Sequence, residues 1–148
     1  YKKAYVNGTV DISEQDIENY INGTTTQIDF VDPIDSKNSY KAMNTVPVKW
    51  NDGASNEEKL QRIITQKWLA NFPLSTEAWA EYRRTGYPEL YPCIDNLSDC
   101  GVSSQRGMRR LSFPYTEAQN NKANYDLGVA ELGGADNEAT DLKWAKKN

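Results

Sequence analysis

The apolar positions of the chain are most regular over residues 55–73. Ser55 is followed three residues later by Glu58, which is the spacing of a capping box at the start of a helix. Behind it, apolar side chains recur at helical spacing until Pro73 stops the pattern. The spacing predicts a helix over about residues 56–71. Its apolar positions are Leu60, Ile63, Ile64, Trp68 and Phe72.

A second helix is predicted directly after the first, over residues 75–85. Ser75 is a candidate N-cap, and Arg83 and Arg84 suit the negative end of the helix dipole. Gly86 is typical of the left-handed residue that ends a helix. Because the link between the two helices is short, we expect them to form an antiparallel or steeply crossed pair. The residues expected at their contact are Leu60, Ile64, Trp68, Trp79 and Tyr82.

A third helix is predicted over residues 120–134, where the pair Gly133-Gly134 ends the pattern. Just upstream, Thr116 with Gln119 has the spacing of a short capped turn.

The N-terminal segment predicts one short helix. Ser13 is its candidate cap, Ile17 and Ile21 are spaced as neighbours on one helix face, and Gly23 is its candidate stop. Residues 1–8 look like the interior of another helix.

Two long segments between these helices are rich in loop-forming residues. Residues 24–54 contain two brief strand-like runs, at 27–31 and 46–50, and residues 86–115 hold three prolines and both cysteines. Loops longer than about 12–15 residues are uncommon in compact domains and are often functional. We therefore expect irregular structure that lies over a larger partner surface.

Composition excludes several classes of function. The chain has 148 residues, the size of a single domain, and its net charge of −4 gives no basic footprint for nucleic acid. No apolar run approaches the length of about 18 residues that a membrane span needs. The chain has no histidine, which excludes Ser-His-Asp and Cys-His catalysis and histidine zinc sites. No carboxylate pair stands out as acid and nucleophile, so we expect neither an enzyme nor a cofactor or metal.

Three loop aromatics are candidates for ligand binding: Trp50, Tyr87 and Tyr91. Amphipathic rings in loops often meet ligands or partners, and the apolar C–H faces of sugars stack on such rings. The same rings can also simply anchor their loops. Trp50 is the strongest candidate because it precedes a turn and has polar neighbours that could bind hydroxyl groups.

The two cysteines, Cys93 and Cys100, allow two states. In an exported protein they could close a small disulfide ring, and in a cytosolic protein they would be free thiols. Two cysteines without histidine give only half a zinc site. The surrounding loop favours the disulfide.

Two arginine pairs, Arg83-Arg84 and Arg109-Arg110, could hold an anion. Alternatively, their guanidinium groups could satisfy helix-end carbonyls, pair with acidic residues and stack on aromatic rings. The acidic net charge and the lack of a phosphate-binding loop favour the structural role.

Three motifs, taken in order, resemble the C-terminal portion of the SusD/RagB family of Bacteroidetes. They are "QRIITQKWLANF", "EAWAEYRRTGYPEL" and "RRLSFPYTEAQNNKANYDLGVAELGGADNEATDLKW". The resemblance covers about residues 55–144. It implies a mainly α fold, the C-terminal part of an α-superhelix of tetratricopeptide-like helix pairs, with long irregular loops and a few short strands. Residues 1–54 would supply a helix and a long loop region, and residues 55–148 the family-matching helices and loops.

The resemblance also implies a function. Members of this family are non-catalytic surface lipoproteins that capture oligosaccharides or other nutrients and pass them to a TonB-dependent, SusC-like transporter in the outer membrane. Attachment to the membrane would run only through an N-terminal lipid anchor absent from this chain. Export would favour the disulfide between Cys93 and Cys100. The motif residues look structural, so the resemblance assigns no ligand contact to any of them.

Two alternatives stay open from the sequence. A fragment of a carboxylate-dependent glycoside hydrolase would also have aromatic-rich loops. The chain could also be a transporter-docking segment without direct sugar contacts.

Overall fold

The computed structural model describes residues 3–5 and 9–145. Its first elements are two short antiparallel strands, β1 (Lys3–Tyr5) and β2 (Thr9–Asp11), in which Lys3 pairs with Asp11. The expected helix over residues 1–8 is therefore wrong at β1, and the rest of that segment lies outside the described residues. The sequence explains the outcome, because an Asn-Gly dipeptide lies between two runs that contain β-forming residues.

The expected N-terminal helix is confirmed as α1 (Glu14–Ile21). The Ser13 hydroxyl accepts a hydrogen bond from the Asp16 N–H at 3.1 Å, and the Ser13 N–H donates to the Asp16 carboxylate at 3.0 Å. This reciprocal pair is a complete capping box. Asn22, rather than Gly23, is the C-cap.

The two central helices are α2 (Asn56–Ala70) and α3 (Ser75–Thr85). The cap of α2 is confirmed, since the Ser55 hydroxyl accepts from the Glu58 N–H at 3.1 Å. Gly86 ends α3 in the left-handed conformation, with φ of 81°. The predicted N-cap of α3 is wrong. Ser75 already lies inside the helix, with Leu74 at the cap position.

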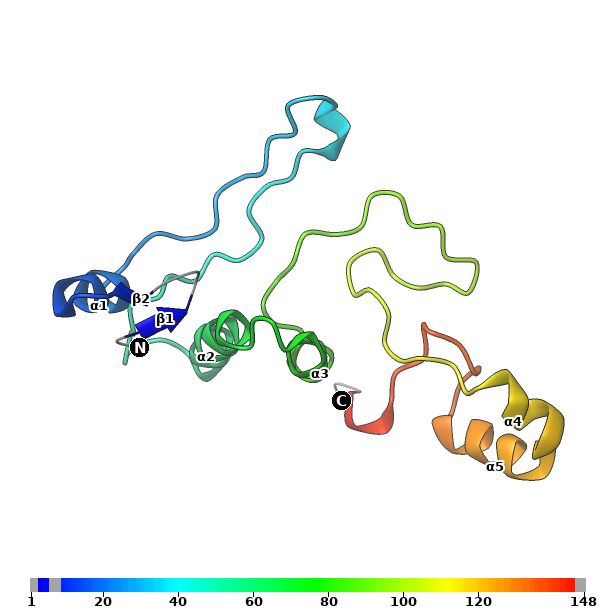
Figure 1. The fold of residues 1–148 in the computed structure, drawn as a ribbon. Helices are drawn as coiled ribbons and strands as arrows, with labels where there is room; N and C mark the ends of the chain where they lie inside the picture. The colour runs from blue at the N-terminus through cyan, green and yellow to red at the C-terminus, as the bar shows by residue number, and fades with distance from the viewer. Residues whose placement is uncertain (1–2, 6–8, 146–148) are drawn as a thin grey trace.

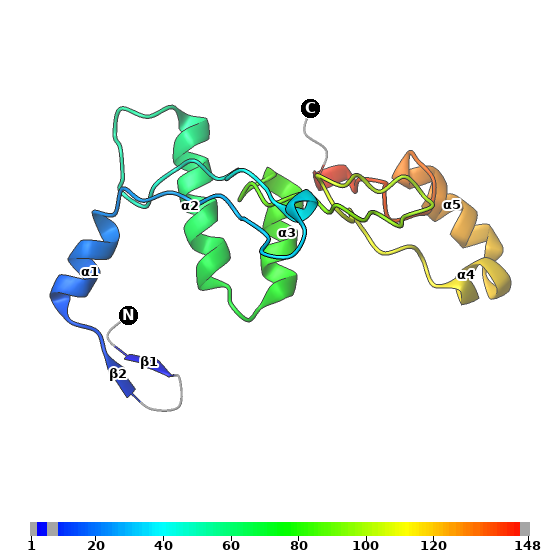
Figure 2. The same ribbon diagram turned by 90° about the horizontal axis from the view of Figure 1, so that it is seen from above.

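Helices α2 and α3 lie side by side (Figures 1 and 2), and the expected contact between them forms in part. Ile64 is buried, and Trp79 and Tyr82 are half-buried. Near the end of α2, however, Trp68 is 37% exposed. The Lys67 ammonium group, close to that end, donates to the Glu81 carboxylate at 2.7 Å and ties α2 to α3. Leu60 is also half-buried, and Phe72 is exposed.

The C-terminal helices are α4 (Tyr115–Asn120) and α5 (Lys122–Leu132), which pack on each other (Figure 1). Gly133 ends α5 with φ of 66°, as predicted. The capped turn expected at Thr116 is instead a short helix that Pro114 precedes.

Two long loops extend to the same side of the helices (Figure 1). The first, residues 22–55, contains a short 3₁₀ turn, η1 (Ser36–Asn38), and one isolated bridge between Phe30 and Tyr40. The strand-like run at 46–50 forms no strand in the described chain. The second loop covers residues 87–114, and η2 (Lys143–Ala145) follows α5 near the C-terminus. The mainly α class with long loops and few short strands is confirmed.

Candidate functional site

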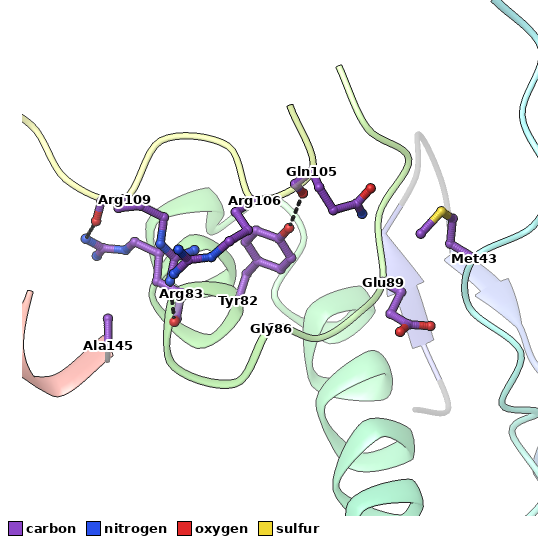
Figure 3. Close-up of a pocket in the computed structure, with 9 residues that line it drawn as sticks. All are labelled: Met43, Tyr82, Arg83, Gly86, Glu89, Gln105, Arg106, Arg109 and Ala145. Carbon is purple, nitrogen blue, oxygen red and sulfur yellow. Dashed lines mark hydrogen bonds between the residues drawn. The ribbon is translucent and has the colours of Figure 1, made fainter. Parts of the chain in front are cut away.

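Three arginines, Arg83, Arg106 and Arg109, lie together between α3 and the second loop (Figure 3). The Arg83 guanidinium donates to the Arg109 carbonyl at 2.9 Å, and the Arg109 guanidinium donates to the Arg83 carbonyl at 2.6 Å. The Arg83 side chain also lies over the Trp79 ring, 3.6 Å from its centroid. This reciprocal arrangement fixes the end of α3 to the loop.

One carboxylate neutralises part of this cluster. Asp141 accepts from the Nε of Arg109 and from the guanidinium of Arg106, each at 2.6 Å. Burial acts to raise the pKa of Asp141, but the hydrogen bonds from the two arginines outweigh it and the pKa is lowered. The cavity beside these residues has a volume of about 310 Å³.

Arg110, which follows Arg109 in the chain, pairs with Asp136. Arg110 is 4% exposed, and its guanidinium donates to the Asp136 carboxylate and lies 4.7 Å from the centroid of the Phe113 ring. Arg84, the other member of the first arginine pair, donates to the Glu81 carboxylate at 2.6 Å. The structural role expected for both arginine pairs is confirmed.

Trp50 lies at an open groove between α1 and α2. The groove has a volume of about 910 Å³ and an apolar lining with a few polar groups. Trp50 is 48% exposed, and its indole N–H donates to the Asp52 carboxylate at 2.8 Å. Because the only polar group of the indole has a partner within its own turn, what Trp50 offers to a ligand is its ring. Polar groups in the lining come from Tyr20, Gln66 and Asp16.

Tyr87 is half-buried where the second loop leaves α3. Its hydroxyl donates to the Glu57 carboxylate at 2.7 Å, which ties the loop to the first turn of α2. This hydrogen bond, with burial and the nearby negative charge, raises the pKa of Tyr87 to about 12. These contacts describe a packing residue.

Tyr91 belongs to a cluster of three rings that joins the two long loops. Its ring stacks on Tyr40, with centroids 5.7 Å apart, and lies 6.4 Å from the centroid of Phe30. Its hydroxyl donates to the Ile28 carbonyl at 2.7 Å. Sequence reasoning missed Phe30 and Tyr40. The one local signal for them was the strand-like run at 27–31, which contains Phe30. The isolated bridge between Phe30 and Tyr40 requires extended backbone of that kind.

The structure thus does not bring the three candidate aromatics into one site. Trp50 borders the groove of α1 and α2, Tyr87 contacts Glu57, and Tyr91 contacts the first loop.

Both cysteines are free thiols in the structure, so the disulfide expected between Cys93 and Cys100 is not formed in it and stays a prediction for the exported protein. The Cys100 thiol donates to the Glu138 carboxylate at 3.4 Å and lies 3.3 Å from the Ser98 hydroxyl, whereas Cys93 is exposed. In the structure, the Cys100 thiol therefore contacts the polar groups of Glu138 and Ser98 and is not bonded to Cys93.

Within the described residues, no group of three histidine, cysteine or acidic side chains could hold a metal ion. None of the described helices combines the length and the apolar character that crossing a membrane requires.

Comparisons with known proteins place the chain in a family. A family model described as SusD-like, "Susd and RagB outer membrane lipoprotein", matches residues 2–145, beyond the 55–144 that the motifs covered. A chitin-binding SusD homologue from Flavobacterium johnsoniae is 41% identical, with a TM-score of 0.82 over 90% of this chain and 28% of that one.

Two further solved structures agree. A SusD homologue from Bacteroides uniformis is 54% identical, with a TM-score of 0.71 over 74% of this chain and 23% of that one. A SusD-like protein from Bacteroides thetaiotaomicron is 38% identical, with a TM-score of 0.76 over 88% of this chain and 28% of that one. The chain thus spans less than a third of the length of these relatives. A comparison with curated proteins found no match. The family model and the similar structures together show that the chain belongs to the SusD-like family of outer-membrane lipoproteins.

Proposed function

We propose that this chain is part of a non-catalytic surface lipoprotein of the outer membrane that binds oligosaccharides and passes them to a TonB-dependent, SusC-like transporter. The chain would be the C-terminal part of that protein. The strongest support is the relative from Flavobacterium johnsoniae, which binds chitin and aligns with 90% of this chain. Chitin oligosaccharides are therefore the first ligand class to test.

Trp50 is the residue that we propose to stack against sugar. It is an exposed ring at the border of an open groove, and its N–H already has an acceptor in Asp52. A pyranose ring presents C–H groups to such a surface, while the Gln66 amide and the Tyr20 hydroxyl in the same lining can bind hydroxyl groups. Those two side chains already hydrogen-bond each other, so their orientation is fixed before a ligand arrives.

The test is calorimetric titration of the intact protein with N-acetylglucosamine oligomers and, in parallel, with oligosaccharides of starch and plant cell walls. We expect Trp50→Ala to weaken binding about tenfold and Trp50→Phe to keep most of it, because a stacked ring is worth on the order of 1–3 kcal/mol. Tyr115→Ala is the matched control, since Tyr115 is a 75% exposed aromatic on α4 and does not line the groove.

Each outcome has a clear meaning. Binding without release of shorter sugars supports the proposal, whereas released sugar would instead identify a glycoside hydrolase. Equal affinities of Trp50→Ala and the unmodified protein would show that this ring only anchors its turn.

A further inference from the structure

The ring cluster of Phe30, Tyr40 and Tyr91 has features of a binding surface that its loop-anchoring role does not require. We propose that it is a second sugar-stacking platform, with the exposed ring of Phe30 as its contact surface and the Tyr40 hydroxyl as its polar group. This inference rests on the proposed glycan-binding function. None of the three residues lines the groove of Trp50, so the two surfaces can be tested separately.

The platform is held in place before any ligand arrives. Phe30 and Tyr40 exchange two backbone hydrogen bonds of 2.9 Å each across the isolated bridge. Next to the bridge, the Lys41 ammonium group donates to the Asp29 carboxylate at 2.6 Å. The Tyr91 hydroxyl fixes the second loop to the first through the Ile28 carbonyl. Rings fixed in this way lose little conformational freedom when they bind, which favours affinity.

The exposure of the rings is uneven. Phe30 remains 45% exposed, with the Tyr91 ring centroid 6.4 Å from its own. Tyr40 and Tyr91 are half-buried beneath the contact that they make with each other. The cluster therefore holds Phe30 through a tilted contact with Tyr91 and leaves it partly open to solvent, and stacking of a pyranose requires such an accessible ring.

The Tyr40 hydroxyl supplies the polar group. It makes no hydrogen bond to any residue that the structure describes, whereas the hydroxyls of Tyr87 and Tyr91 both have acceptors. A phenolic hydroxyl can both donate and accept, so it suits sugar hydroxyl and acetamido groups. A pyranose that stacks on Phe30 would meet one apolar and one polar feature, and this combination favours a sugar over a purely apolar ligand.

The experiment titrates the intact protein with N-acetylglucosamine hexamer and with the other oligosaccharides named above. We expect Phe30→Leu, which keeps an apolar side chain but removes the aromatic face, to weaken binding about tenfold, and Phe30→Tyr to restore it. Tyr40→Phe removes only the hydroxyl and should weaken binding by a smaller factor. Val31→Ala is the matched control, because Val31 is a 74% exposed neighbour of Phe30 in the same loop but outside the cluster.

Thermal unfolding of each variant separates binding from folding. Tyr91→Phe removes the hydrogen bond to Ile28 and keeps the ring, so it should lower stability more than Phe30→Leu does. Unchanged affinity in Phe30→Leu, with binding by the unmodified protein intact, would overturn the platform and leave the proposed function standing. If Phe30→Leu bound sugar normally but no longer co-purified with the transporter, the surface would be a protein contact instead. No binding by the unmodified protein to any of these sugars would overturn both proposals.

Discussion

Substitution of Asp136 by alanine should destabilise the C-terminal half of the chain strongly. One oxygen of this carboxylate accepts hydrogen bonds from the Arg110 guanidinium and from the Phe113 N–H, the latter at 3.0 Å. The other oxygen accepts from the Tyr125 hydroxyl at 3.0 Å. Asp136 therefore joins the second loop, α5 and the segment after α5 through a single side chain.

The magnitude follows from burial. The side chains of Arg110 and Asp136 are 4% and 9% exposed, so Asp136→Ala would leave the positive charge of Arg110 buried and without its partner. Removing one member of a buried ion pair costs about 3–5 kcal/mol. A domain of this size is stable by only about 5–15 kcal/mol, so the loss is a large share of the total. Replacing both members, as in Arg110→Met with Asp136→Ala, should recover most of it because no buried charge is then left.

Urea unfolding followed by circular dichroism measures both variants. The exposed pair Lys122–Asp126 is the control, and Asp126→Ala should leave the urea midpoint unchanged because side chains 70% and 56% exposed gain little from pairing. A cost of less than about 1 kcal/mol for Asp136→Ala, or no recovery in the double variant, would refute the reasoning.

The same pair predicts a pH dependence. Burial acts to raise the pKa of Asp136, but the hydrogen bonds from Arg110, the Phe113 N–H and Tyr125 outweigh it, so the pKa lies below its ordinary value of 3.8. A lowered pKa in the folded state means that the unfolded chain takes up the proton first as the pH falls. The stability difference between the unmodified protein and Asp136→Ala should therefore be complete above about pH 5 and shrink as the pH falls below 3.8.

Three further predictions concern α3 and its surroundings. Tyr87→Phe should remove the tyrosine that ionises near pH 12, which absorbance at alkaline pH would show as one lost titration step. Because the pKa of Tyr87 is raised in the folded state, the stability contributed by its hydrogen bond to Glu57 should persist below pH 10 and be lost toward pH 12. Gly86→Ala should lower the free energy of unfolding in urea by about 1 kcal/mol, because the φ of Gly86 is 81°. Gly128→Ala is the control and should be neutral or slightly stabilising, because a methyl group there would meet the Phe113 ring at an ordinary distance of 3.5 Å. Thr85→Val should lower the thermal midpoint, because the buried hydroxyl of Thr85 accepts from the Tyr87 N–H at 3.1 Å and valine would leave that N–H without its acceptor.

Features that depend on neighbours in the chain were predictable from sequence. The cap at Ser55 and the stop at Gly86 are local signals, because a helix end is decided within one turn of the chain. The two ends of α3 show the limit of such signals. Ser75 has the right chemistry for a cap, but its N–H donates to the Pro73 carbonyl at 2.8 Å, so the turn had begun before Ser75.

The candidate site was less predictable because its contacts are distant in sequence. The Tyr91 hydroxyl meets a carbonyl 63 positions away, and no periodicity reports such a pairing. Sequence alone therefore identified Tyr91 as a loop aromatic and could not supply Phe30 and Tyr40 as its partners. The cysteines show the same limit, since Cys100 finds an acceptor in Glu138, 38 positions away, rather than a bond to Cys93.

The way in which the long loops are held connects the fold with the proposed function. Few large apolar side chains are buried in the described chain, whereas Arg109 and Arg110 are each 4% exposed and bind carboxylates or carbonyls of other segments. Directional contacts of this kind fix a loop at a few points without covering it, unlike an apolar core, which would bury every large ring it could. The aromatic rings of the loops can therefore remain open to solvent at little cost to the fold. This arrangement would hold exposed rings such as Trp50 and Phe30 firmly enough for the sugar binding that we propose.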